Sequence, residues 1–168
     1  STLGDAVLVG DMIKRVCKDA GTRTKKAVAA LPATEVFHTI ISIPLPGTPT
    51  EDLRPAIEAQ AKKVFPLPVE EMVLDSVVLD KELLKSVGKG ETKEGKEKFI
   101  RIFLTGAPKT LIQKYLDLFA KIGLELVSLE TEVMSLVRAL VSDEDAQIMI
   151  VDMGGKRTNV LIADGGIP

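Results

Sequence analysis

Four residues near the end of the chain have the types and spacing needed to contact a phosphate group: Asp152, Gly154, Gly155 and Thr158. They lie between two short apolar runs, and two such runs joined by a glycine-containing turn are typical of a β-hairpin. Backbone amides at glycines and a threonine hydroxyl can hold phosphate oxygens, while a carboxylate can hold Mg²⁺ or its waters. The alternative interpretation is a structural β-turn in which Asp152 is only solvated.

The composition excludes several classes of function. The chain has 168 residues, 45% hydrophobic and 27% charged, which is ordinary for a globular protein with a real core. A formal net charge of −2, without a basic stripe, argues against nucleic acid as a partner. One cysteine and one histidine exclude an internal disulfide, suit a reducing cytoplasm and predict no metal site. No apolar run approaches the roughly 20 residues that span a bilayer, so we expect no direct membrane insertion.

The apolar periodicity predicts an α/β protein in which helices and strands are mixed along the whole chain. Helices are expected at 5–20, 51–65, 108–122 and after a capping Thr131, and strands at 26–31, 36–43, 72–79, 99–105 and 124–129. An interior proline destabilises a helix by roughly 3 kcal/mol, so Pro55 is expected in the first turn of a helix that begins near Glu51, or at a kink. Residues 85–98 lack apolar periodicity and predict a solvated hairpin tip.

Six short phrases spread over nearly the whole chain carry a resemblance to a known family. They are ALP at 30–32, TEDL at 50–53, KVFPLPVEE at 63–71, GAPK at 106–109, GLELV at 123–127 and the D-x-G-x-x-x-T pattern at 152–158. Together they resemble the PilM family of type IV pilus assembly proteins, in the FtsA/PilM branch of the actin-like ATPase superfamily. The Pro-Leu-Pro and Ala-Pro-Lys phrases are the more specific ones, because the wider superfamily shares the hairpin pattern.

This resemblance implies a fragment of an actin-like (ribonuclease H-like) first domain with an inserted SHS2-type 1C subdomain. Residues 1–34 and 123–146 then belong to subdomain 1A, residues 35–122 form the insertion, and residues 147–168 begin the second domain. An actin-like site also needs a first phosphate hairpin and an adenine-binding segment, and these residues contain neither. ATP and Mg²⁺ are therefore expected in a longer parent, with no cofactor and no catalytic residue in this fragment.

The resemblance also implies a cytoplasmic scaffold of pilus assembly, held at the inner membrane through a partner. In that family the partner is the cytoplasmic tail of the membrane protein PilN, which docks in a groove between the first domain and the insertion; other pilus assembly proteins are further expected partners. Phe65, Pro66, Leu67 and Pro68 are the candidate rim of this groove. The alternative interpretation of these four residues is a helix end followed by a packed turn.

Three alternatives remain beside the scaffold. The chain resembles, at the level of the fold, an FtsA-like cell-division protein and a GspL-like secretion protein. An ATP-dependent conformational switch is a second class of function, with Asp152 holding Mg²⁺, the amides of Gly154 and Gly155 meeting phosphate, and Thr158 adding a hydroxyl. Self-association through an exposed strand edge of the insertion is a third.

Overall fold

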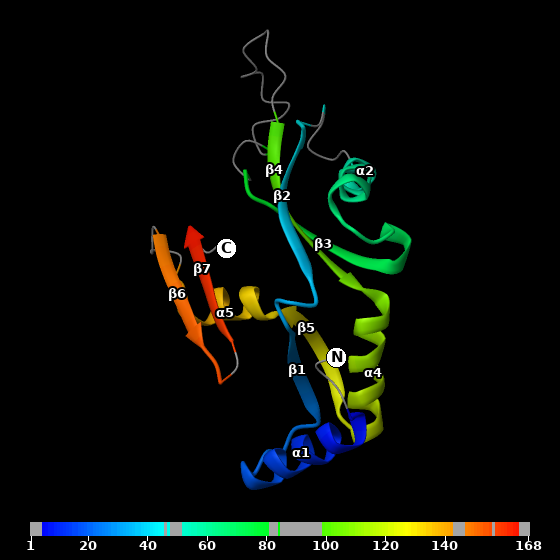
Figure 1. Cartoon of the computed structure of the whole chain (residues 1–168), viewed down its shortest axis with the longest axis vertical. Coiled ribbons are helices and arrows are strands. Elements are labelled where there is room, and N and C mark those ends of the chain that lie inside the picture. The colour runs from blue at the N-terminus through cyan, green and yellow to red at the C-terminus, as the bar shows by residue number, and fades with distance from the viewer. Residues whose placement is uncertain are drawn as a thin grey trace. The chain divides into compact units, whose positions relative to one another are not determined.

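The computed structural model describes residues 5–45, 47, 52–80, 84, 99–142, 147–155 and 157–164. The chain is a mixed α/β protein whose contacts divide it into two compact units, and Figure 1 gives the position of each element along the chain. Unit 1 comprises Ser1–Glu35 and Leu111–Pro168, and unit 2 comprises Val36–Thr110. The predicted hairpin tip at 85–98 lies outside the described residues, as does Glu51, the expected start of the second helix.

Unit 1 contains a parallel pair of strands, β1 (Lys26–Leu31) and β5 (Glu125–Thr131). Helix α1 (Ala6–Asp19) precedes them, and the side chain of Asp5 accepts hydrogen bonds from two backbone amides of its first turn. These amides have no partner inside the helix, so the cap satisfies them. Gly21 follows the helix with φ +64, a conformation that favours glycine at helix ends.

Helix α5 (Glu132–Leu140) begins directly after β5. The hydroxyl of Thr131 accepts a hydrogen bond from the Met134 amide at 3.2 Å, which confirms Thr131 as the N-cap. The neighbouring carboxylate of Glu132 accepts a hydrogen bond from the Ala33 amide at 3.1 Å. The start of α5 therefore holds the turn that follows β1.

Helix α4 (Lys109–Ile122) belongs to unit 1 from Leu111 onward, although the sequence analysis placed residues 35–122 together in the insertion. The Tyr115 hydroxyl donates a hydrogen bond to the carbonyl of Ala30 at 3.5 Å, and a Cβ added at Gly10 would lie 2.8 Å from Ile122. Because these contacts join α4 to β1 and α1, the compact unit 2 ends before the helix. The assignment of actin-like subdomains remains a prediction.

Unit 2 is built on a three-stranded antiparallel sheet in the order β2-β4-β3. The strands are β2 (Phe37–Pro44), β3 (Met72–Val78) and β4 (Phe99–Pro108). Side chains alternate between the two faces of a strand, and the central strand places Ile100, Ile102 and Leu104 on one face. These three side chains have 0% exposure, so that face is the core of the unit.

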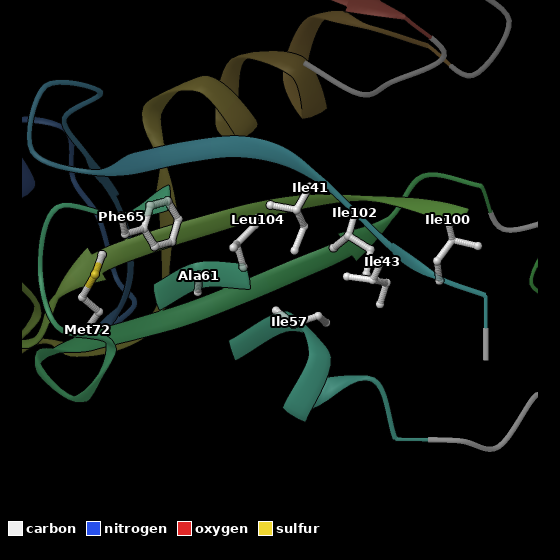
Figure 2. Packing of buried hydrophobic residues seen from close by; sticks show 9 residues of the cluster. All are labelled: Ile41, Ile43, Ile57, Ala61, Phe65, Met72, Ile100, Ile102 and Leu104. Atoms are coloured by element: carbon white, nitrogen blue, oxygen red, sulfur yellow. The ribbon is translucent and has the colours of Figure 1, made fainter. Parts of the chain in front are cut away.

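Helix α2 (Arg54–Val64) supplies the other side of this core. Pro55 lies in its first turn, where the missing amide of proline costs no helical hydrogen bond, so the helix needs no kink there. The short 3₁₀ helix η1 (Val69–Glu71) then leads into β3. Figure 2 shows the buried cluster between helix and sheet: Ile41, Ile43, Ile57, Ala61, Phe65, Met72, Ile100, Ile102 and Leu104.

Candidate functional site

The predicted hairpin at the end of the chain is present as strands β6 (Gln147–Met153) and β7 (Thr158–Asp164). The strands pair antiparallel, with Asp152 opposite Asn159 and Met153 opposite Thr158 as the last pairs before the turn. The turn therefore contains residues 154–157. The hairpin places the four candidate phosphate-site residues at one end of a short two-stranded sheet.

The carboxylate of Asp152 has a partner that the sequence analysis did not identify. The Asn159 side-chain amide donates a hydrogen bond to Oδ2 of Asp152 at 3.2 Å, and both residues are half-buried. The two residues are directly opposed in the ladder, so their side chains lie on the same face of the hairpin. Asn159 thus orients a carboxylate that keeps oxygen available for a hard cation such as Mg²⁺.

The turn uses one of the two glycine amides that were expected to meet phosphate. The Gly154 amide donates a hydrogen bond to the carbonyl of Arg157 at 2.8 Å, which closes the turn. At Gly155 an added Cβ would meet nothing within 4 Å, so this residue borders open space. Open space beside Gly155 leaves room for a ligand at this residue.

Thr158 and Asp152 do not share a face of the hairpin. Successive residues of a strand point to opposite faces, and the Met153–Thr158 pair follows the Asp152–Asn159 pair directly. Met153 and Thr158 are exposed, in agreement with this alternation. A ligand that contacts both the carboxylate and the hydroxyl must therefore wrap around the end of the hairpin.

The positively charged side chain of Arg157, in the same turn, is hydrogen-bonded to another part of unit 1. Arg157 Nη1 donates a hydrogen bond to the hydroxyl of Thr34 at 2.8 Å. Thr34 belongs to the turn after β1 in which the Glu35 amide bonds to the carbonyl of Pro32. The sequence analysis missed Arg157 because nothing in a local pattern links it to a residue 123 positions away.

The four candidate rim residues comprise one buried, one half-buried and two exposed side chains. Phe65 has 9% exposure and its ring centroid lies 6.1 Å from that of Phe37, inside the core of unit 2. Leu67 packs against the same core, whereas Pro66 and Pro68 are exposed. Phe65 and Leu67 therefore fit the alternative interpretation, a helix end followed by a packed turn. The two prolines are the members of this segment with exposed side chains.

A second surface of unit 2 has the character of a docking face. The strand alternation puts Ile40, Val73 and Phe99 on the side of the sheet opposite α2, and they are 52%, 46% and 48% exposed. On the same face the ring of Phe103 lies opposite Ile40 in the ladder, and the His38 ring centroid is 6.1 Å from it. Exposed apolar side chains gathered on one sheet face are typical of surfaces that bind another chain.

No described helix is long and apolar enough to cross a membrane. Among the described residues, no three side chains of His, Cys, Asp and Glu gather closely enough to hold a metal ion.

A family profile described as type IV pilus assembly protein PilM matches residues 2–166. The chain belongs to the PilM family. A solved chain from a PilM–PilN type IV pilus biogenesis complex superimposes with a TM-score of 0.74 at 21% identity, over 96% of this chain and 46% of that chain. The mixed α/β fold of this PilM-family chain is thus shared with a protein of the same family.

A second solved structure shares the fold more distantly. It is the cytoplasmic domain of EpsL, an inner-membrane component of the type II secretion system of Vibrio cholerae. It matches with a TM-score of 0.55 at 14% identity, over 92% of this chain and 56% of that chain. No curated protein matches the chain. This PilM-family chain spans about half the length of the solved chains that it resembles.

Proposed function

We propose that this chain is a scaffold of type IV pilus assembly that binds the cytoplasmic tail of a PilN-type membrane protein. The family match carries the proposal, because the solved relative that covers 96% of this chain comes from a PilM–PilN complex. In this proposal the protein works in the cytoplasm and is held at the inner membrane through its partner. Unit 2 is the SHS2-type insertion of an actin-like domain, and other pilus assembly proteins contact the same scaffold.

The outer face of the unit 2 sheet is a part of the described surface that suits such a tail. Ile40, Val73 and Phe99 provide apolar contacts, and an extended peptide can place alternate side chains against a sheet. Pro66 and Pro68 are exposed at the end of α2 and are the remaining candidates for rim contacts. The buried Phe65 and the half-buried Leu67, which packs against the core, support this corner from within the unit.

The test is a titration of a synthetic PilN-type tail peptide into the chain, followed by calorimetry. Ile40→Ser should weaken binding about tenfold if Ile40 is one of the few anchor residues of the interface, which cost more than about 1 kcal/mol when truncated. Val64→Ser, at an exposed position of α2 in the same unit, is the matched control and should bind normally. Wild-type protein that binds no peptide would reject the proposal. Equal peptide affinity of wild type and Ile40→Ser would show that the docking site lies elsewhere.

We propose nucleotide binding in the longer parent as a second function, favoured by the Asp152–Asn159 pair beside a glycine turn. The residues fit ATP and Mg²⁺ in part: the carboxylate suits the cation, while the turn already uses the Gly154 amide. The Gly155 amide and the Thr158 hydroxyl remain as phosphate donors. Bound MgATP would supply a switch between conformations rather than a reaction performed by this chain alone.

MgATP titration calorimetry on this chain and on a longer parent tests the second function. Binding by the parent only would support a site completed by further residues. Failure of both to bind would leave the hairpin as a structural turn, and the protein as a scaffold without nucleotide. That outcome would leave the peptide-binding proposal standing, because the peptide titration tests it independently.

A further inference from the structure

The turn that follows β1 is held from two sides by residues distant in the sequence. Glu132, at the start of α5, accepts the Ala33 amide at 3.1 Å, and Arg157, in the β6–β7 turn, donates to the Thr34 hydroxyl at 2.8 Å. Inside the turn the Glu35 amide bonds to the Pro32 carbonyl at 3.0 Å. This short segment is also the covalent link into unit 2, which begins at Val36.

Arg157 connects this segment to the candidate phosphate turn through a single residue. Its backbone carbonyl accepts the Gly154 amide and closes the hairpin turn, while its side chain reaches Thr34. Arg157 and Thr34 are not buried, so the side chain can exchange partners without leaving a desolvated charge. A guanidinium bound to an anion gains charge attraction in addition to its hydrogen bond, which a neutral hydroxyl does not offer. A phosphate oxygen at the turn would therefore compete successfully with Thr34.

We propose that Arg157 is an anion-sensing latch. It holds Thr34 when the hairpin turn carries no anion, and it turns to a phosphate group when one binds beside Gly155, so that anion binding loosens the segment 32–35. The inference rests on the second proposed function, since it requires phosphate at the hairpin. Glu132 continues to hold Ala33 in both states, which limits the change to a partial release rather than unfolding of the turn.

The experiment is amide hydrogen exchange read by NMR at Ala33 and Glu35, with inorganic phosphate as the probe and chloride at equal ionic strength as the blank. Without phosphate, Arg157→Gln and Thr34→Val should each speed exchange about two- to fivefold, the loss expected for one exposed hydrogen bond. Phosphate should speed amide exchange in the wild type by the same factor and should leave the exchange rate of Arg157→Gln unchanged. Arg138→Gln is the matched control, because Arg138 is an exposed arginine of unit 1 paired with Glu130.

Each outcome separates the latch from the site on which it depends. Unchanged exchange in both Arg157→Gln and Thr34→Val would overturn the latch. Phosphate that shifts the amide resonances of Gly155 and Thr158 without changing exchange at Glu35, whose amide bonds inside the turn, would overturn the coupling and leave the anion site intact. Phosphate that shifts neither Gly155 nor Thr158 would reject an anion site in this chain and the sensing role with it, whereas nucleotide binding by the longer parent is decided by the separate MgATP titration.

Discussion

A Cβ added at Gly106 would lie 2.8 Å from Cε2 of Phe65. Gly106 is in the central strand β4, and the Phe65 ring follows the last turn of α2. Contacts shorter than 3.0 Å between such atoms do not persist, so the absent side chain is what lets the ring lie against the sheet. Phe65 is thus part of the reason that α2 packs where it does.

Gly106→Ala should destabilise the protein. The added methyl group must displace an aromatic ring in a closely packed core, and overpacking of this kind typically costs about 1–3 kcal/mol. The free energy of unfolding in urea measures the effect. Gly155→Ala is the control, because its Cβ would meet open space, and its stability should equal or slightly exceed that of the wild type. Equal stability of the two variants would show that the core around Phe65 yields easily.

Substitutions in the Phe65–Pro68 segment should differ in their effect on stability, because this segment contains a buried ring and two exposed prolines. Phe65→Ala removes a buried ring and should lower the free energy of unfolding by about 3–5 kcal/mol. Pro66→Ala and Pro68→Ala change exposed residues and should lower it by no more than about 1 kcal/mol, through the unfolded chain. Thermal unfolding followed by circular dichroism distinguishes the two groups. A proline variant as unstable as Phe65→Ala would contradict this division.

Most elements of the fold were predictable because their signals are local. The apolar run at 26–31 is β1 without a change of boundary, and Thr131 caps α5 as its side-chain chemistry indicates. The position of α4 was not predictable in the same way. Its apolar stripe shows that one face is buried, but Gly10 and Ala30, which it contacts, lie about 100 residues away.

The candidate site was predictable in its hairpin and less so in its contacts. The glycine turn between two apolar runs indicated β6 and β7 correctly. The hydrogen bond from the Gly154 amide to the Arg157 carbonyl depends on the turn type that the chain adopts, and several turn types accept glycine at this position. The opposite orientations of Asp152 and Thr158 follow from a strand register that the motif does not specify.

The pair of Asp80 and Arg101 should make stability fall in acid. Hydrogen bonds from the Arg101 side chain, and then from its backbone amide, lower the pKa of Asp80 below its usual value. Because the folded pKa is the lower one, the stabilisation is present above the ordinary pKa of about 4 and is lost as the pH falls below it. Asp80→Asn should lose no more than about 1 kcal/mol at pH 7, and less at pH 3.

Urea unfolding of wild type and Asp80→Asn at pH 7, 5 and 3 measures this pH dependence. Asp19→Asn is the control, since Asp19 pairs with Arg15 at 3.8 Å between two highly exposed side chains. That control should match the wild type at every pH. A stability difference for Asp80→Asn that stays constant between pH 7 and pH 3 would contradict the shifted pKa.

Tyr115 should ionise at higher pH than a free tyrosine. Burial is the main cause that raises its pKa, and the nearby carboxylates of Glu35 and Glu132 add to the effect. The chain has a single tyrosine, so its ultraviolet absorbance titration reports Tyr115 alone. A raised folded pKa means that stability is fully present below the unfolded value of about 10 and is lost as the pH rises through the folded value.

The matched variant for Tyr115 is Tyr115→Phe, which keeps the ring and removes the hydroxyl. The hydrogen bond to Ala30 is 3.5 Å long, so the variant should be within about 1 kcal/mol of the wild type at pH 7. Above pH 10 it should unfold less readily than the wild type, because no buried phenolate can form. A midpoint for Tyr115 at the value of free tyrosine would show that the hydroxyl is solvated.

In the longer parent, Asp152→Asn should remove the dependence of nucleotide binding on Mg²⁺ while leaving the fold intact. The Asn159 amide can still donate a hydrogen bond to the new side-chain oxygen, so the change in unfolding free energy should stay within about 0.5 kcal/mol. The lost charge is what a hard cation needs, so Mg²⁺ should tighten ATP binding by the wild type and not by the variant.

Asp164→Asn changes an exposed carboxylate on the same hairpin and should behave as the wild type. Titration of ATP with and without Mg²⁺ reads the difference, and an equal Mg²⁺ effect in all three proteins would exclude Asp152 from the cation site.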